Sequence, residues 1–189
     1  MIGIVGGTFD PPHIGHLAVA AAAVEQLAMD TVTFLPAGDP WQKSTIDVAP
    51  ARHRLAMTRL ASTEADSFVV DDREMVRPGP SYMMDTIESM DEDVVLILGA
   101  DAARGIHSWH RSTDLLDAVT IAVAARPGID MADVEDAIGG GLVQLSMPTI
   151  DLSGTEIRQH VAAGRSPRFL VPDSVCDYIE ANALYRGSG

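Results

Sequence analysis

The sequence predicts an α/β fold built on a doubly wound parallel sheet. Segments rich in valine and isoleucine alternate with alanine-rich or amphipathic segments of helical length. One segment, VVLIL between acidic flanks, is apolar without interruption, as are strands buried on both faces of a parallel sheet. With 189 residues, of which 47% are hydrophobic and 21% charged, the chain can bury one sizeable core. Strands that alternate with helices imply right-handed crossovers between parallel strands.

The first half of the chain alternates strand and helix. Leu17, Ala21 and Val24 recur at helical spacing and predict the first helix, and Pro36 ends the second predicted strand. Ser81 is expected to cap a later helix with its side chain. In chain order we expect a strand at Ile2–Val5, a helix at His16–Met29, a strand at Thr31–Leu35, a helix at Ala51–Ala61, a strand at Ser67–Val70 and a helix from Ser81 to Met90.

The second half continues the alternation and ends in helices. Ser153 and Glu156 have the spacing of a capping box, which opens a helix. In chain order we expect a strand at Asp93–Leu98, a mostly helical segment at Asp101–Leu116, a strand at Val119–Ala124, a helix at Ile129–Ile138, a strand at Leu142–Leu145, the capped helix and a last helix at Pro172–Leu184. The prediction is one Rossmann-like domain over residues 1–189, with a core over about 1–150 and a C-terminal helical extension over about 151–186.

The charge balance limits the classes of partner. The formal net charge is −14 and the calculated isoelectric point is near 4.5. Binding to nucleic acid or to an anionic membrane needs clustered cations, so neither partner is expected. A small anionic ligand in a local positive pocket is compatible with this charge. Cys176 is the only cysteine, which excludes intramolecular disulfides and zinc sites built from several cysteines.

No targeting segment is recognisable. The first apolar run, MIGIV, is too short for a signal peptide and lacks a basic segment before it. The longest apolar run, LAVAAAAV, is far too short to span a membrane. We therefore expect a cytoplasmic protein, and a homo-oligomer is compatible with the sequence.

The stretch GGTFDPPHIGHL after the first strand predicts a phosphate site. Gly6 and Gly7 allow positive φ angles and the close approach of a phosphate to the backbone. His13 and His16 lie three residues apart at the start of a helix, so their rings share one face beside unpaired N–H groups. A metal site formed by Asp10, His13 and His16 is the alternative, because these residue types also bind divalent ions.

These residues resemble a known family. His13-Ile-Gly-His16 is similar to the HxGH signature of the nucleotidyltransferase superfamily, and the wider pattern is similar to bacterial nicotinate-nucleotide adenylyltransferases. The further motifs that carry the resemblance are LPAGDPWQK, HRLAM, PSYMMDT, LGADAARGIHSWH, VAARPG and LSGTEIR, which cover nearly the whole chain.

The resemblance implies a reaction and its partners. ATP would transfer its adenylyl group to nicotinate mononucleotide, giving nicotinate adenine dinucleotide and pyrophosphate. Mg²⁺ would arrive with ATP, and no dedicated metal ligands in the protein are implied. Three alternatives stay open: another HxGH nucleotidyltransferase, such as a phosphopantetheine adenylyltransferase or a cytidylyltransferase; a nucleotide sensor without turnover; and a metal-dependent hydrolase using Asp10, His13 and His16.

The resemblance also implies which residues act. The catalytic residues would be His13, His16, Lys43 and Arg158. ATP would in addition contact Gly6, Gly7, Thr8, Phe9, Gly99, Asp101, Ser153 and Thr155. Nicotinate mononucleotide would contact Lys43, Thr86, Trp109 and His110, with Trp109 stacked on the pyridine ring and backbone N–H groups near Thr86 and His110 on its carboxylate.

Several of these residues have a simpler interpretation. Lys43, the only lysine beside twelve arginines, could be an ordinary exposed loop residue. Asp101 could cap the next helix, and Trp109 could be part of the core. Gln42 and Met83 depart from the family pattern, which has a histidine and a threonine at these places. Arg52, Arg54 and Arg126 are assigned no role.

Overall fold

The computed structural model describes residues 1–40 and 48–186. The predictions for Lys43 and Gln42 lie outside the described residues. None of the helices in these two ranges has both the length and the apolar character needed to cross a bilayer.

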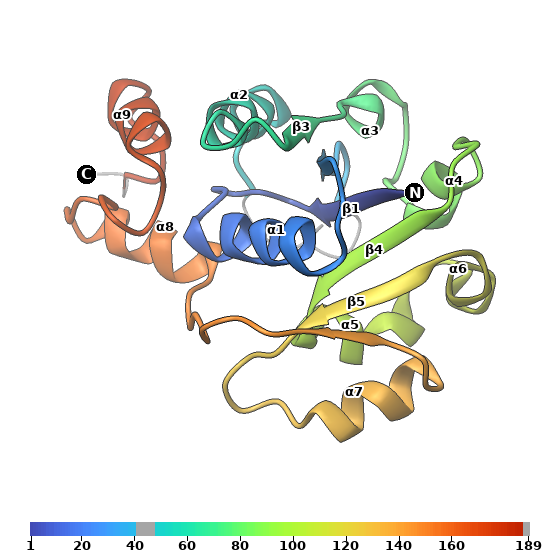
Figure 1. Ribbon diagram of the computed structural model, residues 1–189. Helices are drawn as coiled ribbons and strands as arrows, with labels where there is room; N and C mark the ends of the chain where they lie inside the picture. The colour runs from blue at the N-terminus through green and yellow to red at the C-terminus, as the bar shows by residue number, and fades with distance from the viewer. Residues whose placement is uncertain (41–47, 187–189) are drawn as a thin grey trace. The chain divides into compact units, whose positions relative to one another are not determined.

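The strands form one six-stranded sheet of the expected class (Figure 1). In chain order they are β1 (Ile2–Gly7), β2 (Val32–Pro36), β3 (Phe68–Val70), β4 (Val94–Gly99), β5 (Thr120–Ala124) and β6 (Val143–Leu145). Their order in the sheet is β3-β2-β1-β4-β5-β6, and the pairs β1/β4, β4/β5 and β5/β6 are parallel. The order reverses beside β1, which confirms the doubly wound topology, and such folds bind ligands at the carboxyl ends of the strands next to the reversal.

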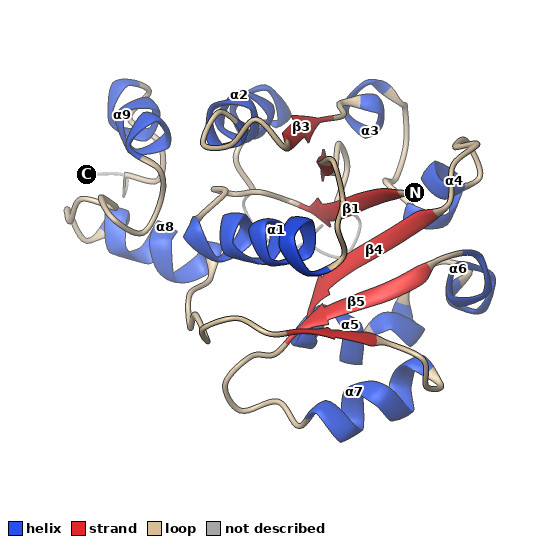
Figure 2. Ribbon diagram, in the orientation of Figure 1, coloured by secondary structure: helices blue, strands red, loops and turns tan. Residues whose placement is uncertain are grey.

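Helices connect the strands, and two helices follow the last strand (Figure 2). In chain order they are α1 (Ile14–Gln26), α2 (Ala51–Ser62), α3 (Arg73–Val76), α4 (Met83–Ile87), α5 (Ala100–Arg104), α6 (Ser112–Ala118), α7 (Met131–Ile138), α8 (Gly154–Ala162) and α9 (Asp173–Ala181). A short 3₁₀ helix, η2 (Ile106–Ser108), lies between α5 and α6.

The chain divides into two compact units. The first comprises residues 1–6, 18–33 and 82–151, and the second residues 7–17, 34–81 and 152–189. In the first unit, β4 is buried along Val94–Leu98, as the uninterrupted apolar run predicts. In the second unit, α2, α8 and α9 share a core that contains Met57, Ile157 and Val175. The prediction of one domain stays a prediction.

The predicted helical segment at 101–116 consists of three short helices, and one predicted cap is absent. Residues 101–116 are mostly helical, as expected: α5, η2 and α6 are separated at Gly105 and at Trp109, which is extended, with φ −78° and ψ 150°. Ser81 does not cap α4, so that expectation is wrong. Its hydroxyl instead accepts the N–H groups of Gly38 and Asp39, at 2.9 and 3.3 Å, and holds the chain that follows β2.

Candidate active site

The turn after β1 has a different backbone from the one predicted. Gly6 and Gly7 complete β1, and neither has a positive φ, so that expectation is wrong. The left-handed residue is Phe9, with φ 49°. Both glycines are closely packed: a Cβ on Gly6 would lie 2.5 Å from the Met83 methyl, so the end of that side chain would have to move, and one on Gly7 would lie 3.2 Å from the Phe9 ring. Met83, where the family pattern has a threonine, thus occupies the space over Gly6.

The two histidines lie together, as their spacing predicts. The centroids of the His13 and His16 rings are 3.8 Å apart. The His13 carbonyl accepts the first backbone bonds of α1, and the His16 Nδ1 accepts the His13 N–H at 3.2 Å. This is the backward half of a capping box, with an imidazole in place of the usual carboxylate. Since Nδ1 accepts, the ring proton of His16 is on Nε2.

The buried ring of Phe9 packs against His16 of this histidine pair. Its ring is 1% exposed and packs edge-on against His16, with 4.9 Å between the centroids, and against Phe34 at 5.7 Å. A residue in the left-handed region costs free energy unless its surroundings hold it there. The buried ring provides those surroundings, so Phe9 orients the imidazole of His16. The buried ring leaves only the backbone of Phe9 for the contact predicted with ATP.

The start of α8 brings Arg158 to the same turn. The Ser153 half of the predicted capping box is confirmed, since the Ser153 Oγ accepts the Glu156 N–H at 3.3 Å. Arg158 donates from Nη1 to the Asp10 carbonyl at 2.8 Å and from Nη2 to the Thr155 hydroxyl at 3.2 Å. Its side chain is 17% exposed. The second unit therefore gathers two imidazoles, a guanidinium and the N-terminal end of α1, a set suited to anions.

Arg54 has a role that the sequence analysis did not assign. It is 2% exposed and donates to four backbone carbonyls: those of Thr8, Ala37, Gly38 and Ala49, at 2.6 to 3.0 Å. Burial lowers the pKa of this guanidinium, and the negative charge of Asp10 opposes that shift. Arg54 thus fastens the residues that follow β1 and β2 to the start of α2.

Replacing Gly154 by alanine is expected to lower the free energy of unfolding by about 1–3 kcal/mol. A Cβ there would lie 2.8 Å from the Asp10 carbonyl oxygen, the acceptor of the Arg158 bond. The matched control is Gly105→Ala, where the nearest atom would be 3.6 Å away and φ is −88°. Urea denaturation of both variants measures the difference. Equal stability of G154A and the wild type would contradict the tight fit at Gly154.

The first unit holds the predicted ribose contacts. Gly99 ends β4 and precedes α5, so Asp101 lies inside the first turn of α5 and does not cap it. The interpretation of Asp101 as an N-cap is therefore wrong. Its carboxylate accepts a bond from Arg126 at 2.9 Å and remains 52% exposed, open to a further partner. Arg126 positions this carboxylate, a role that only the structure reveals.

The predicted nicotinate contacts also lie in the first unit. Trp109 is half-buried, so it is not a core tryptophan. The His110 ring is exposed and stacks on Tyr82, with 4.1 Å between centroids. Thr86 is fully buried, and both its N–H and its hydroxyl donate to the Tyr82 carbonyl, at 3.3 and 3.4 Å. The roles predicted for Trp109, His110 and Thr86 stay predictions.

Arg111 fixes the turn that follows His110. It has a left-handed backbone, with φ 53° and ψ 44°. Its guanidinium donates two bonds to Glu88, at 2.7 and 2.9 Å, and one to Asp114 at 2.7 Å. A two-point pair of this kind sets orientation as well as energy. Arg111 therefore joins the segment carrying Trp109 to the end of α4, and no local sequence pattern indicates it.

The alternative of a metal site is not favoured. The carboxylate of Asp10 is already engaged by other donors, because Oδ1 accepts the Tyr185 hydroxyl at 2.7 Å and Oδ2 accepts the Ala49 N–H at 3.3 Å. Within residues 1–40 and 48–186, no three histidine, cysteine, aspartate or glutamate side chains lie close enough together to hold an ion.

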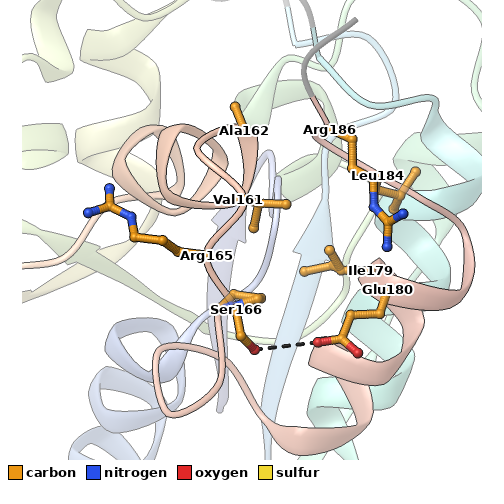
Figure 3. A pocket seen from close by; sticks show the side chains of 10 residues that line it. Val161, Ala162, Arg165, Ser166, Ile179, Glu180, Leu184 and Arg186 are labelled. Carbon is orange, nitrogen blue, oxygen red and sulfur yellow. Dashed lines mark hydrogen bonds between the residues drawn. The ribbon is translucent and has the colours of Figure 1, made fainter. Parts of the chain in front are cut away.

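A cavity of about 450 Å³ lies elsewhere in the second unit, beside α8 and α9 (Figure 3). Val161 and Ile179 form part of its wall, and Ser166 donates to Glu180 across 3.4 Å. None of the described residues predicted for the active site lines it. We assign it no part in the chemistry.

Known proteins resemble this chain over its whole length. The family model described as cytidylyltransferase-like matches residues 4–160. A "Probable nicotinate-nucleotide adenylyltransferase" of Roseiflexus sp. (strain RS-1) is 43% identical, covering 98% of this chain and 98% of that protein. The protein of the same name from Pseudomonas aeruginosa (strain UCBPP-PA14) is 40% identical, covering 98% of this chain and 97% of its own length.

The fold is also that of solved structures. The nicotinic acid mononucleotide adenylyltransferase of Plasmodium falciparum, complexed with NaAD, has a TM-score of 0.79 at 17% identity, over 97% of this chain and 96% of its own. The same enzyme complexed with APC has a TM-score of 0.77. Together with the full-length relatives, these findings mean that the chain belongs to the cytidylyltransferase-like family and, within it, to the nicotinate-nucleotide adenylyltransferases.

Proposed function

We propose that this chain transfers the adenylyl group of ATP to nicotinate mononucleotide, giving nicotinate adenine dinucleotide and pyrophosphate. The observation that carries the proposal is the pair of imidazoles at the first turn of α1, those of His13 and His16, whose ring centroids are 3.8 Å apart. The names of the relatives support the choice of acceptor.

The reaction is a displacement at phosphorus. An oxygen of the mononucleotide phosphate bonds to the α-phosphorus of ATP, and the bond from that phosphorus to the bridging oxygen breaks. Pyrophosphate leaves with the bond electrons. The attacking phosphate is already ionised near neutral pH, so the protein has no proton to remove. Catalysis then consists of positioning and of neutralising the charge that shifts onto the leaving group.

The second unit supplies the donors for that charge. His16 would donate from Nε2 to a phosphate oxygen, and His13 would donate beside it. Arg158 would bind the triphosphate with guanidinium N–H groups other than those that donate to Asp10 and Thr155. Gly7, Thr8 and Phe9 would contribute backbone contacts. Ser153 and Thr155 would act indirectly, because their hydroxyls already bind Glu156 and Arg158.

The other predicted ligand contacts fall on residues of the first unit. Asp101, at the carboxyl end of β4, would accept from ribose hydroxyls, and Gly99 leaves space beside it. Trp109 would stack on the nicotinate ring, which its half-buried position permits. Backbone N–H groups near Thr86 and His110 would bind the nicotinate carboxylate. An amide would present its own donors to these groups and bind less well.

Mg²⁺ would enter with ATP. The side chains at the start of α1 are N–H donors, and a helix N-terminus disfavours a cation. The ion would therefore be held by phosphate oxygens and water rather than by the protein, and it would neutralise charge on the triphosphate.

The setting of the reaction follows from its chemistry and from the charge of the chain. ATP and nicotinate mononucleotide are the partners, and a chain of net charge −14 is not expected to bind nucleic acid. We place the protein in the cytoplasm, where ATP is available. A homo-oligomer is compatible with this function.

A coupled assay of pyrophosphate release tests the proposal. The chain is given Mg²⁺ and ATP with nicotinate mononucleotide, nicotinamide mononucleotide or phosphopantetheine in separate reactions. We expect release with nicotinate mononucleotide, at least about tenfold less kcat/KM with the amide, and none with phosphopantetheine. EDTA is expected to abolish release. Release with phosphopantetheine alone would overturn the choice of acceptor and keep the superfamily.

A further inference from the structure

A tyrosine near the end of the chain contacts the first loop of the phosphate site. The Tyr185 hydroxyl donates to Asp10 Oδ1 at 2.7 Å, although the two residues are 175 positions apart. Asp10 follows Phe9 directly, is 4% exposed, and supplies the carbonyl that binds Arg158. Neither Asp10 nor Tyr185 has a place in the reaction proposed above, so their contact needs a separate account.

The Asp10 carboxylate interacts electrostatically with two arginines. Arg54 is engaged by four carbonyls and has Asp10 as a neighbouring negative charge. The Arg158 Nη1 lies 3.6 Å from Asp10 Oδ2, too far for a direct hydrogen bond. Arg158 thus hydrogen-bonds to the backbone carbonyl of Asp10 and makes only a longer ion pair with its carboxylate.

This separation is not the arrangement that the charges alone favour. A carboxylate and a guanidinium prefer a two-point pair with short bonds. If the Asp10 carboxylate turned to make that pair, it would occupy the N–H groups with which Arg158 would bind phosphate. Two donors oppose the turn: the Tyr185 hydroxyl on Oδ1 and the Ala49 N–H on Oδ2, the latter at 3.3 Å.

Two left-handed residues lie in the segment that brings Tyr185 to Asp10. Ala183 and Tyr185 both have left-handed conformations, with φ 50° and 61°. Such conformations are uncommon outside glycine and persist where the surroundings hold them. They turn the chain after α9, and Tyr185 then reaches Asp10. Burial and the negative charge of Asp10 raise the pKa of the Tyr185 hydroxyl, so it remains a donor at every pH used for assays.

We propose that Tyr185 is a positioning residue of the phosphate site: its hydroxyl keeps the Asp10 carboxylate from closing onto Arg158 in a short two-point pair, which leaves the guanidinium available to the triphosphate. This inference rests on the proposed binding of ATP, but not on the identity of the acceptor.

Tyr185→Phe tests the inference, with Tyr178→Phe as the matched control. Tyr178 lies on α9 in the same unit, and its hydroxyl bonds to the His53 Nδ1 at 2.9 Å. Each variant thus loses one hydroxyl and one hydrogen bond. We expect Y185F to raise the Kd for Mg·ATP, measured by calorimetry, about tenfold, as for the loss of one charged hydrogen bond. Y178F is expected to change it less than about twofold.

Two double variants separate positioning from a merely structural role. The variant Arg158→Ala has no guanidinium with which the Asp10 carboxylate could pair, so adding Y185F to it is expected to change the Kd for ATP less than about twofold. The variant Asp10→Asn lacks the negative charge that would pair with Arg158, so adding Y185F to it is also expected to change the Kd for ATP less than about twofold. Thermal melts of every variant fix a temperature at which all are folded.

The outcomes separate the two proposals. If Y185F binds ATP as the wild type does, or weakens binding only as much as Y178F, the inference is wrong. It is also wrong if Y185F lowers affinity equally with and without Arg158. Failure of the wild type to use nicotinate mononucleotide, with ATP binding intact, would instead contradict the proposed function. The binding measurement needs no turnover, so it tests Tyr185 in either case.

Discussion

Replacing His16 by asparagine is expected to lower kcat/KM for adenylyl transfer about 10²–10³-fold and to leave the fold intact. This is the usual size of the loss when one preorganised donor is removed from a developing negative charge. The side-chain oxygen of the introduced asparagine can still accept the His13 N–H, as the Nδ1 of His16 does now at 3.2 Å. What the variant loses is the Nε2–H, the group that would face phosphate.

His160→Asn is the control for this substitution. His160 lies on α8 in the same unit, is half-exposed, and its ring contacts the Ser166 carbonyl at 3.0 Å. We expect its kcat/KM to stay within about twofold of the wild type. Initial rates of pyrophosphate release and thermal melts of both variants are the measurements. If H16N kept more than a tenth of the wild-type kcat/KM, His16 would not be a catalytic residue.

Replacing Arg54 by lysine is expected to lower the free energy of unfolding by about 3–5 kcal/mol, the typical loss when one partner of a buried charged network is removed. Lysine keeps the charge, but its ammonium is compact and cannot reproduce a planar fork that reaches four carbonyls. Those carbonyls belong to Thr8, Ala37, Gly38 and Ala49. Each carbonyl left buried without a donor adds its own cost.

Arg59→Lys is the matched control on the same helix. Arg59 is 59% exposed and pairs with Asp72 at 2.8 Å. An exposed pair of this kind contributes little, so we expect a change below about 1 kcal/mol. Denaturant titration gives both free energies, and equal slopes show that the change is in stability rather than in the unfolded state. A loss below about 1 kcal/mol in R54K would mean that the four carbonyls find other donors.

Local patterns were enough to predict most elements. The apolar run at β4 and the Ser153 cap of α8 each have a cause within a few residues, and both are confirmed. The pairing of His13 with His16 is of the same kind, because residues three apart in a first helical turn are neighbours whatever surrounds them. The helix begins at Ile14 rather than His16 because the carbonyl of His13 caps it.

Other features of the site could not be predicted in this way. Phe9, rather than a glycine, adopts the left-handed backbone because its ring is buried against His16 and Phe34, a contact that no turn pattern contains. The break at residues 105–111 depends on Arg111, whose partner Glu88 is 23 residues away. No local signal singles out Arg54, because two other arginines lie on the same helix and only the fold buries this one.

By itself, the sequence determined the order of most strands and helices, the Ser153 cap of α8 and the residue types gathered after β1, because periodicity and capping act over a few residues. The tertiary structure alone decided how those residues are held: Arg54 on four carbonyls, and Asp10 between Tyr185 and Arg158. The physical reason is that the free energy of a buried polar group depends on its partners, and the fold brings these from parts of the chain up to 175 positions apart.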